Sequence, residues 1–404
     1  MNVISARRFV IYFGVVSALA DFVYEGSRSV VGPYLATLGA SAALVGVVTG
    51  AGEAVALVFR LVSGPLADRT RRYWALSIAG YAVTLISVPL LAVARPLAAA
   101  SSLVIAERFG KAVRTPARDT MLSQASTDMG RGWGFAIHET LDQTGAFAGP
   151  LLVALVLYLG GGYRLGFAVL AVPAALSLLI LARLRKAAPD PAAYEDRSRD
   201  PGAATGASTD SFLSSWRNQP RRLWLYSLFT ALTMFGYATF ALLAYHLQVR
   251  HVMPAAEIPV LYAVAMGIGA LVALPAGRVY DRIGLQGLVV LPLLSAIVPF
   301  LSFSREVALV WLGAAAWGAV TGIHESTMRA AVADLIPADR RGAAYGIFTS
   351  IYGVAWLAGS ALIGLLYSFS INAVIVFVLF AQALALLSFV PLAKEPRLMR
   401  EAPH

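Results

Sequence analysis

Three ionisable residues, Asp21, Glu25 and Arg28, stand four and three positions apart in a run of the chain that is otherwise largely apolar. On a helix this spacing places all three side chains on one face. A second charged stripe has the same periodicity, and acids and cations at such spacing can bind protons or a charged solute. The members of this second stripe are Glu107, Lys111, Arg114 and Arg118, with Arg108 turned off it.

Further acids stand in neighbouring apolar runs. A carboxylate near a basic stripe is suited to exchange a proton for the charge of a solute, because its protonation changes between wet and dry surroundings. The alternative is that each acid only fixes the register of two helices through an ion pair. The candidate proton-coupling residues are Asp21, Glu25, Glu53, Glu139 and Asp142, with the first two favoured.

The composition makes these charges unusual. Of the 404 residues, 58% are hydrophobic and 13% are charged, whereas soluble domains carry about 25% charged residues. A water-soluble globular protein is therefore excluded, and the lack of cysteine excludes thiol catalysis, Cys-ligated metals and disulfides. The net charge of +10 fits basic loops at a membrane surface better than nucleic-acid binding.

Apolar runs bounded by Gly, Pro and charge are long enough to cross a bilayer, which takes about 20 residues. We therefore expect an all-α membrane protein with twelve transmembrane helices in two pseudo-symmetric six-helix bundles. The runs are 9–36, 42–63, 73–94, 97–125, 132–159, 164–184, 222–248, 255–276, 285–303, 306–334, 341–368 and 371–392.

The segment 186–220 is rich in Pro, Ala, Ser, Asp and Arg and cannot cross a bilayer, so it is interpreted as a cytoplasmic linker. It separates a bundle at 1–185 from a bundle at 221–394, which a cytoplasmic tail at 395–404 follows. The segments on the linker's side of the membrane carry 21 basic residues and the opposite segments carry four. This bias predicts cytoplasmic termini in a bacterial inner (plasma) membrane.

Charges inside the predicted spans need partners or a wet cavity, because an unpaired charge at the bilayer centre costs roughly 2.5 to 3.5 kcal/mol even on lenient scales. Counting inward along the antiparallel runs 97–125 and 132–159 pairs Arg118 with Glu139, and Arg114 with Asp142. We expect a buried ion network that joins these runs to 9–36. The basic members of this network are Arg28, Arg108, Lys111, Arg114, Arg118 and His138.

The two halves of the chain repeat one another in the same orientation, which predicts an internal duplication. Three matches at nearly one offset support it. They are 64–69 with 277–282 at 213, Thr120-Met121 with Thr327-Met328 at 207, and 131–149 with 341–359 at 210.

These motifs resemble those of the major facilitator superfamily of secondary transporters, along the whole chain. The most specific one is a Gly, three residues, then Asp-Arg and a basic cluster, although Arg71 stands where that family usually has a further Gly. Arg108-Phe-Gly110-Lys-Ala is similar to the family's second motif. Gly145-Ala-Phe-Ala-Gly149-Pro150 is similar to its antiporter motif, without the two glycines expected next. The resemblance implies that the first, fourth, seventh and tenth spans line a central cavity.

The first motif can act as a conformational latch. The Asp68 carboxylate can bind the positive N-terminal end of a facing helix while the arginines hold the cytoplasmic surface; the alternative is that these charges only set the topology. The latch residues of the two copies are Gly64, Asp68, Arg69, Arg72, Gly277, Asp281 and Arg282.

The antiporter-like motif has a structural interpretation of its own. Gly145 and Gly149 lie one turn apart and allow close helix contact, and Pro150 weakens the local hydrogen-bond ladder. The motif therefore indicates either a bend in this helix or close helix packing alone.

The second half holds fewer ionisable residues and more aromatic ones, so we expect proton chemistry in the first half and apolar solute contacts in the second. Aromatic residues at helical spacing are more often packing than ligand contacts. The candidate substrate contacts are Tyr24, Tyr237, Trp317, His324 and Glu325.

The sequence thus predicts a proton-coupled antiporter that exports small amphipathic molecules by alternating access. The alternative is proton-coupled uptake or exchange of a small anionic solute, which Lys111, Arg114 and Arg118 would bind. Walker A, His-Glu-x-x-His and Gly-x-Ser-x-Gly motifs are absent, so no enzyme is expected. The expected partners are the solute, protons and the lipid bilayer, with no cofactor, metal or nucleic acid, and the expected state is a monomer.

Overall fold

The computed structural model describes residues 4–127, 129–194, 219–336 and 341–394, and this part of the chain is helical without a β-strand. The first half comprises α1 (Ala6–Arg28), α2 (Val31–Thr37), α3 (Ala42–Val58), α4 (Arg60–Thr70), α5 (Tyr73–Leu90), α6 (Leu97–Ala125), α7 (Arg131–Tyr158), α8 (Gly162–Val169), α9 (Ala171–Ala187) and η1 (Pro191–Tyr194). The second comprises α11 (Arg221–Phe235), α12 (Phe240–Val249), α13 (Glu257–Ile283), η2 (Gly284–Val289), α14 (Val290–Ser302), α15 (Val307–Leu335), α16 (Arg341–Phe369) and α17 (Ile371–Lys394).

The helices account for twelve membrane crossings. Ten stretches of the described chain are long and apolar enough to span a bilayer. One of them, Glu257–Ser302, contains both α13 and α14 and therefore crosses twice. The 29-residue α6 is the twelfth crossing, and its composition alone would not mark it as one because it carries the charged stripe. The predicted all-α fold with twelve transmembrane helices is confirmed.

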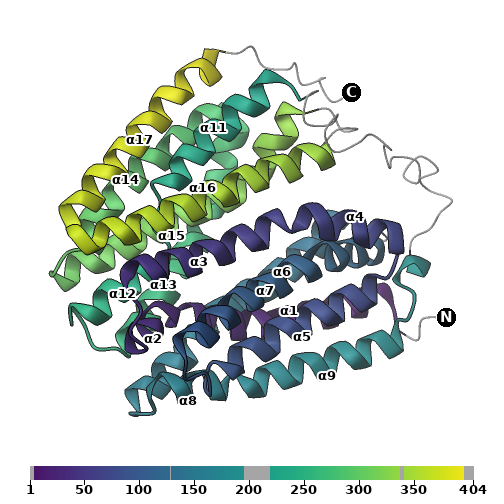
Figure 1. The fold of residues 1–404 in the computed structure, drawn as a ribbon. Helices are drawn as coiled ribbons and strands as arrows, with labels where there is room; N and C mark the ends of the chain where they lie inside the picture. Colours follow the sequence, from purple (N-terminus) through teal and green to yellow (C-terminus); the bar gives the residue numbers. More distant parts are fainter. Residues whose placement is uncertain (1–3, 128, 195–218, 337–340, 395–404) are drawn as a thin grey trace.

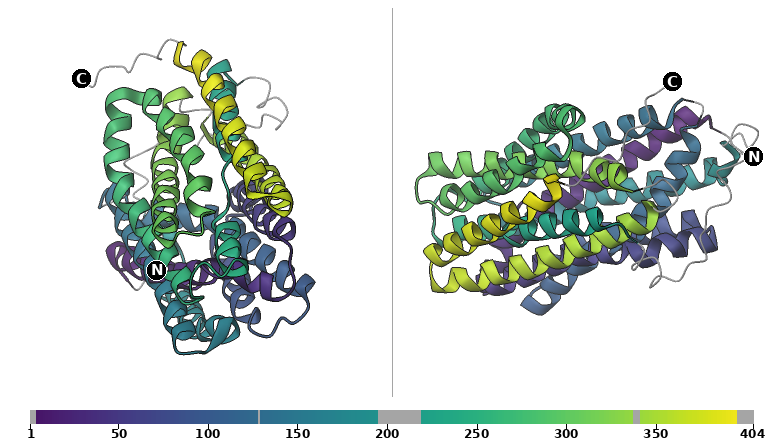
Figure 2. Two further views of the ribbon diagram at one scale, coloured as in Figure 1. Left: turned by 90° about the vertical axis from the view of Figure 1, so that its left-hand side faces the viewer. Right: turned by 90° about the horizontal axis from the view of Figure 1, so that it is seen from above.

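The helices form two bundles, α1 to α9 and α11 to α17, which lie side by side (Figures 1 and 2). Matching glycines show that the two bundles are built alike. A Cβ added at Gly149 of α7 would lie 2.0 Å from the Phe22 carbonyl oxygen of α1, and one added at Gly359 of α16 would lie 2.0 Å from the Phe235 carbonyl oxygen of α11. Each glycine lets the fifth membrane crossing of its bundle touch the backbone of the first crossing, as the internal repeat predicts.

The predicted runs 9–36 and 222–248 are each broken. The first becomes α1 and α2, and the second becomes α11 and α12. The short pieces α2 and α12 pack against each other across the bundles, where a Cβ at Gly32 would lie 1.9 Å from the Ala241 carbonyl oxygen. The two breaks thus bend the outer thirds of these spans together and close one end of the interface.

The closed end lies away from the chain termini. Tyr163 donates a hydrogen bond to Gln248 at 2.6 Å, and the Thr49 and Thr239 hydroxyls are 3.0 Å apart. Figure 1 shows the bundles converging at α2 and α12, with both termini drawn at the opposite end.

The predicted bounds of the ninth span differ from the structure, and most of the predicted linker and tail cannot be compared with it. The ninth span was expected at 285–303, but α14 begins at Val290 because η2 first turns the chain. Most of the predicted linker, 195–218, and the predicted tail, 395–404, lie outside the described residues.

Candidate functional site

A group of ion pairs lies near the middle of the first bundle, centred on Glu53 of α3. Its Oε1 lies 2.7 Å from a terminal nitrogen of Arg28 on α1 and 3.1 Å from one of Arg108 on α6. Arg28 also lies 3.7 Å from Glu25, and Arg108 Nε lies 3.3 Å from Glu107. The two guanidiniums and three carboxylates therefore tie together three helices.

The ring of Tyr24, which is 1% exposed, is shared by three cations. Lys111 Nζ lies 4.0 Å from the ring centroid, and the guanidinium carbons of Arg108 and Arg28 lie at 4.5 and 5.8 Å. The Tyr24 hydroxyl accepts a hydrogen bond from Arg108. Cation–π attraction is strongest away from water, so this ring holds positive charge in place within the bundle. A direct solute contact by Tyr24 has little room in this conformation.

A second ion pair lies nearly two helical turns further along α6 from Arg108. Arg114 is fully buried, its NH2 lies 3.3 Å from Asp21 Oδ1, and its guanidinium lies 4.3 Å from the Tyr81 ring centroid. Gly80 of α5 makes this approach possible, because a Cβ there would lie 2.6 Å from the Arg114 backbone nitrogen. The Arg114–Asp21 pair is thus enclosed by packed side chains.

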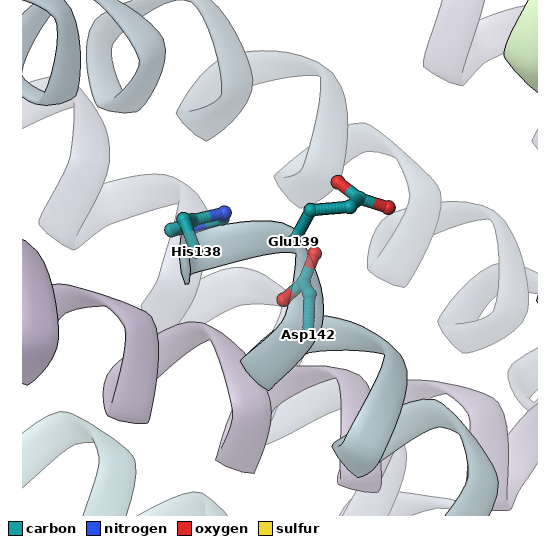
Figure 3. Close-up of side chains that lie close together, drawn as sticks. All are labelled: His138, Glu139 and Asp142. Carbon is teal, nitrogen blue, oxygen red and sulfur yellow. The ribbon is translucent and has the colours of Figure 1, made fainter. Parts of the chain in front are cut away.

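A third group joins α6 to α7. Arg118 Nε lies 2.9 Å from the neighbouring Asp119, and its NH1 lies 4.0 Å from Asp142 on α7. His138 and Glu139 occupy the preceding turn of α7 (Figure 3). Glu139 is exposed and accepts a hydrogen bond from Gln143 at 3.0 Å. Most of these charges sit on the helices that the sequence predicted.

The two predicted pairings between α6 and α7 were wrong, whereas the predicted ion network that joins α1, α6 and α7 is present. Arg118 contacts Asp142 instead of Glu139, and Arg114 contacts Asp21 instead of Asp142. The reason is the close packing of α1 on α7. A Cβ at Gly145 would lie 1.9 Å from the Ala18 carbonyl oxygen. This contact brings α1 close enough for Asp21 to form the ion pair with Arg114.

His138, Glu139 and Asp142 offer ligand atoms that all lie within 4.8 Å of one another (Figure 3). The surroundings do not suit a metal cation. His138 Nε2 lies 2.8 Å from Ser17 Oγ, which itself lies 2.7 Å from the Tyr81 hydroxyl. The Arg118 guanidinium lies beside Asp142 and would repel a metal ion. The arrangement is a buried hydrogen-bond chain from α7 through α1 to α5.

The two candidate aromatic contacts of the second bundle support its wall instead of facing a solute. Trp317 is fully buried and donates from Nε1 to the Ala238 carbonyl at 3.0 Å. Tyr237 stacks on Trp317 and donates to the Trp317 carbonyl at 2.7 Å, with Thr321 Oγ1 at 2.8 Å. Both polar groups are satisfied at the break between α11 and α12, which explains why aromatic residues stand there.

His324 and Glu325 differ although they are neighbours on α15. His324 is buried and stacks on Tyr352 with ring centroids 4.8 Å apart. Glu325 is exposed, and its carboxylate has no hydrogen bond or ion pair with any described residue. Of the two, only Glu325 is placed to meet a solute.

One contact that the sequence did not indicate crosses between the bundles. The Tyr262 hydroxyl of α13 donates a hydrogen bond to Glu25 Oε2 of α1, and both residues are buried. A tyrosine in an apolar run carries no pattern that marks such a role. Glu107 was likewise noticed only as part of a stripe, yet it closes the ion cluster around Glu53.

The latch residues are not engaged in this conformation. Asp68 and Asp281 are exposed and have no ion pair or hydrogen bond of their carboxylates within the described chain. A Cβ at Gly64 or Gly277 would meet nothing within 4 Å. Arg69, Arg72 and Arg282 are also exposed. The latch therefore stays a prediction, and any contact it makes belongs to another conformation.

A small cavity of about 30 Å³ separates the ion cluster from the second bundle. Arg28, Glu53, Glu107 and Arg108 line one side, and Thr239 lies on the other. A cavity needs at least ~10–15 Å³ to hold one buried water, so one or two waters fit. The charges thus face a polar pocket at the interface between the bundles.

Two like-built bundles with buried charges at a shared midplane interface define a secondary transporter, not an enzyme. The chain belongs to the major facilitator superfamily, whose family model matches residues 13–360. It is therefore a multi-pass membrane transporter with a small-molecule substrate.

The chain is similar to relatives of two organisms, and it shares its fold with solved structures. An uncharacterized protein of Mycobacterium tuberculosis (strain ATCC 25618 / H37Rv) is 49% identical over 99% of this chain and 95% of its own length. An uncharacterized MFS-type transporter of Methanocaldococcus jannaschii is 25% identical over 89% of each chain. Among solved structures, the nucleoside transporter NupG has a TM-score of 0.76 at 14% identity, covering 96% of this chain and 100% of its own. A bacterial homolog of the human lysosomal transporter Spinster, inward-facing and unoccupied, has a TM-score of 0.72 at 15% identity, covering 96% and 95%.

Proposed function

We propose that the protein is a proton-coupled antiporter of the bacterial inner (plasma) membrane that exports small amphipathic molecules by alternating access. Both termini are cytoplasmic in this proposal, and the monomer is the working unit. One observation carries it: the carboxylate of Glu25, which can hold a proton, also accepts the hydrogen bond of Tyr262 from the other bundle. Proton binding and closure of the bundles therefore share one residue.

The coupling follows from the charge of Glu25. As a carboxylate it accepts a strong, charge-assisted hydrogen bond from Tyr262 and attracts Arg28 at 3.7 Å. As a carboxylic acid it loses its attraction to Arg28 and becomes a weaker acceptor. A proton that changes the free energy of the closed conformer in this way shifts the population of conformers, which is what coupled transport needs.

Asp21 is the second proton-coupling candidate. Its partner Arg114 is fully buried and stacked on Tyr81, so protonating Asp21 would leave an uncompensated charge inside the bundle. In the proposed cycle Asp21 therefore exchanges its proton less readily than Glu25. The register of α1 against α6 is its main contribution.

Other acids are assigned supporting roles. Glu53 positions Arg28 and Arg108, which both contact it. Asp142 positions Arg118, and the exposed Glu139 lies beside it on α7 as a proton acceptor reachable from water. The hydrogen-bond chain from His138 through Ser17 to Tyr81 supports proton movement between α7 and α5.

Export by antiport is supported by the glycine motif of α7. Gly145 and Gly149 lie against the α1 backbone at Ala18 and Phe22, immediately beside the helical face that carries Asp21 and Glu25. A shift of α7 would therefore move the proposed proton-coupling residues directly. The bacterial membrane is supported by the mycobacterial relative and by the excess of basic residues on the side of the termini.

Uptake or exchange of a small anionic solute is the second candidate. Lys111 favours it, because its ammonium group lies over Tyr24 without a carboxylate partner among the described residues. An anionic group of a solute could then be the ionic partner of Lys111.

The test uses purified protein in lipid vesicles that enclose a pH-sensitive dye. A panel of cationic dyes, organic anions and sugars is added, and solute-driven proton release is measured with and without an imposed pH gradient. The wild-type protein is expected to move protons in exchange for an amphipathic member of the panel. Glu25→Gln should abolish that exchange while the thermal unfolding midpoint stays within a few degrees of wild type.

The matched control is Glu257→Gln, an exposed acid at the start of α13, which should exchange protons like the wild-type protein. Unchanged proton exchange in Glu25→Gln would overturn the role of Glu25. Proton movement in the same direction as an anion would favour the second candidate instead.

A further inference from the structure

Among the described residues, two charged side chains from opposite bundles stand without ionic partners beside a group of paired arginines. Arg28, Arg108, Arg114 and Arg118 each have at least one carboxylate within 4.0 Å. The ammonium group of Lys111 has none within the described part of the chain. On the other bundle, the carboxylate of Glu325 is equally unpaired among the described residues.

Lys111 is held in place by an aromatic ring and has no carboxylate within 4.0 Å among the described residues. Its Nζ lies 4.0 Å from the centroid of the buried Tyr24 ring, and the residue is partly exposed. A cation–π contact fixes the position of an ammonium group without using its hydrogen-bond donors. Those donors have no hydrogen-bond partner among the described residues and can bind an anionic group that reaches the interface between the bundles.

Glu325 is directed by the packing of its own helix. Thr321, one turn before it on α15, bonds to Tyr237, and the adjacent His324 packs on Tyr352. These contacts fix the rotation of α15 and leave the Glu325 carboxylate exposed. Lys111 and Arg28 of the other bundle act on it electrostatically, and Arg28 is already paired with Glu53.

Unpaired charges at membrane depth are unfavourable and normally acquire partners. Here a cation and an acid face the same interface from α6 and α15, each with its hydrogen-bonding capacity unused. We infer that the transport site takes a dipolar solute, whose carboxylate or other oxyanion binds Lys111 and whose protonated amine binds Glu325. This inference rests on the proposed carrier function and narrows its substrate class.

A dipolar solute would also link binding to movement. A molecule that contacts Lys111 with one end and Glu325 with the other joins the two bundles at midplane. A purely anionic or purely cationic molecule can satisfy only one of them. The competing explanation is that Lys111 and Glu325 pair with each other when the bundles rearrange, and the test must separate the two.

The test is binding to purified protein at fixed pH without a gradient. Four matched probes are used: 4-aminobutyrate, butyrate, butylamine and butanol. Affinity is measured by intrinsic fluorescence, since the chain has seven tryptophans, and by ligand-induced thermal stabilisation. The dipolar probe is expected to bind at least about tenfold more tightly than each of the others, as expected for one additional charge-assisted contact.

The variants give a crossed prediction. Lys111→Met should weaken binding of 4-aminobutyrate and butyrate about tenfold or more and leave butylamine unchanged. Glu325→Gln should weaken binding of 4-aminobutyrate and butylamine to a similar extent and leave butyrate unchanged. Lys111→Arg, which keeps the cation, should preserve the wild-type order of affinities. Lys186→Met and Glu257→Gln, both at exposed positions outside the site, should change nothing.

Two outcomes overturn the inference. Either 4-aminobutyrate fails to bind more tightly than the other probes, or the order of affinities is the same in Lys111→Met and Glu325→Gln as in wild type. The second result, with lowered thermal stability, would mean that the two residues only pair with each other. Proton coupling is measured separately in the vesicle assay, whereas this binding test uses no gradient, so failure of the proposed antiport would leave this test intact.

Discussion

Glu25 of α1 accepts a hydrogen bond from Tyr262 of α13, and this bond joins a buried carboxylate of one bundle to a buried hydroxyl of the other. Glu25 also lies 3.7 Å from Arg28, which binds Glu53 at 2.7 Å. The interface between the bundles is therefore connected to the whole ion cluster. Any change of charge in that cluster is felt where the bundles meet.

Tyr262→Phe tests this connection. A hydrogen bond to a charged group contributes about 1.5–3 kcal/mol, so its loss should raise the fraction of molecules open at the α2–α12 end roughly tenfold or more. The chain has no cysteine, so spin labels can be placed at Val93→Cys and Val307→Cys, two exposed positions at that end. Distance distributions between the labels should gain a longer component.

The control is Tyr226→Phe, whose buried ring stacks on Phe348 inside the second bundle at 4.9 Å. It should leave the distance distribution unchanged. If Tyr262→Phe and Tyr226→Phe behave alike, the cross-bundle bond does not hold the closed end.

The glycines of the repeat make a second prediction, on stability. An added Cβ at Gly149 or Gly359 would lie 2.0 Å from a backbone carbonyl oxygen of α1 or α11. Gly149→Ala and Gly359→Ala should each destabilise the protein by ~1–3 kcal/mol or more, because backbone cannot move aside as a flexible side chain can. Thermal unfolding in detergent measures the effect, and similar losses in both variants would reflect the duplication.

Gly64→Ala is the matched control, since nothing lies within 4 Å of a Cβ there. Because Ala is a better helix former than Gly, Gly64→Ala should keep or slightly raise stability. An equal loss of stability there would mean that close packing does not account for the losses at Gly149 and Gly359.

The fold could largely be predicted from the sequence because apolar length and repeat spacing are local properties. The run 97–125 coincides with α6, and the 210-residue offset relates the contacts of Gly149 and Gly359. The same periodicity placed the charged stripes on the correct helices.

Partner choice could not be predicted in the same way. Which acid meets Arg114 depends on how α1, α6 and α7 slide and tilt against one another: the sequence predicts Asp142 of α7, whereas the structure pairs Arg114 with Asp21 of α1. The contact of Tyr262 depends on the docking of two bundles, which leaves no trace in the spacing of residues along one chain.

Arg114 and Asp21 provide a third prediction. Arg114 is fully buried and lies 3.3 Å from Asp21. Removing one partner leaves a buried charge uncompensated, which costs about 3–5 kcal/mol. Asp21→Asn and Arg114→Met should each lower the thermal unfolding midpoint strongly. The double variant should be less destabilised than the sum of the two, and strict additivity would mean that the residues do not act as a pair.

The latch motif gives the last prediction, because Asp68 has no partner in the described chain and a carboxylate without contacts contributes little to this conformation. If Asp68 binds a facing helix only when the termini end of the interface closes, Asp68→Asn should leave thermal stability within about 0.5 kcal/mol of wild type while depleting the closed conformer. Spin labels at Trp133→Cys and Gln286→Cys, two exposed positions at that end, would report a smaller short-distance population.

Arg250→Gln, an exposed charge change at the opposite end, should leave that population as in wild type. An unchanged short-distance population in Asp68→Asn would reduce the motif to a topological signal, since positive charge alone would then account for its arginines.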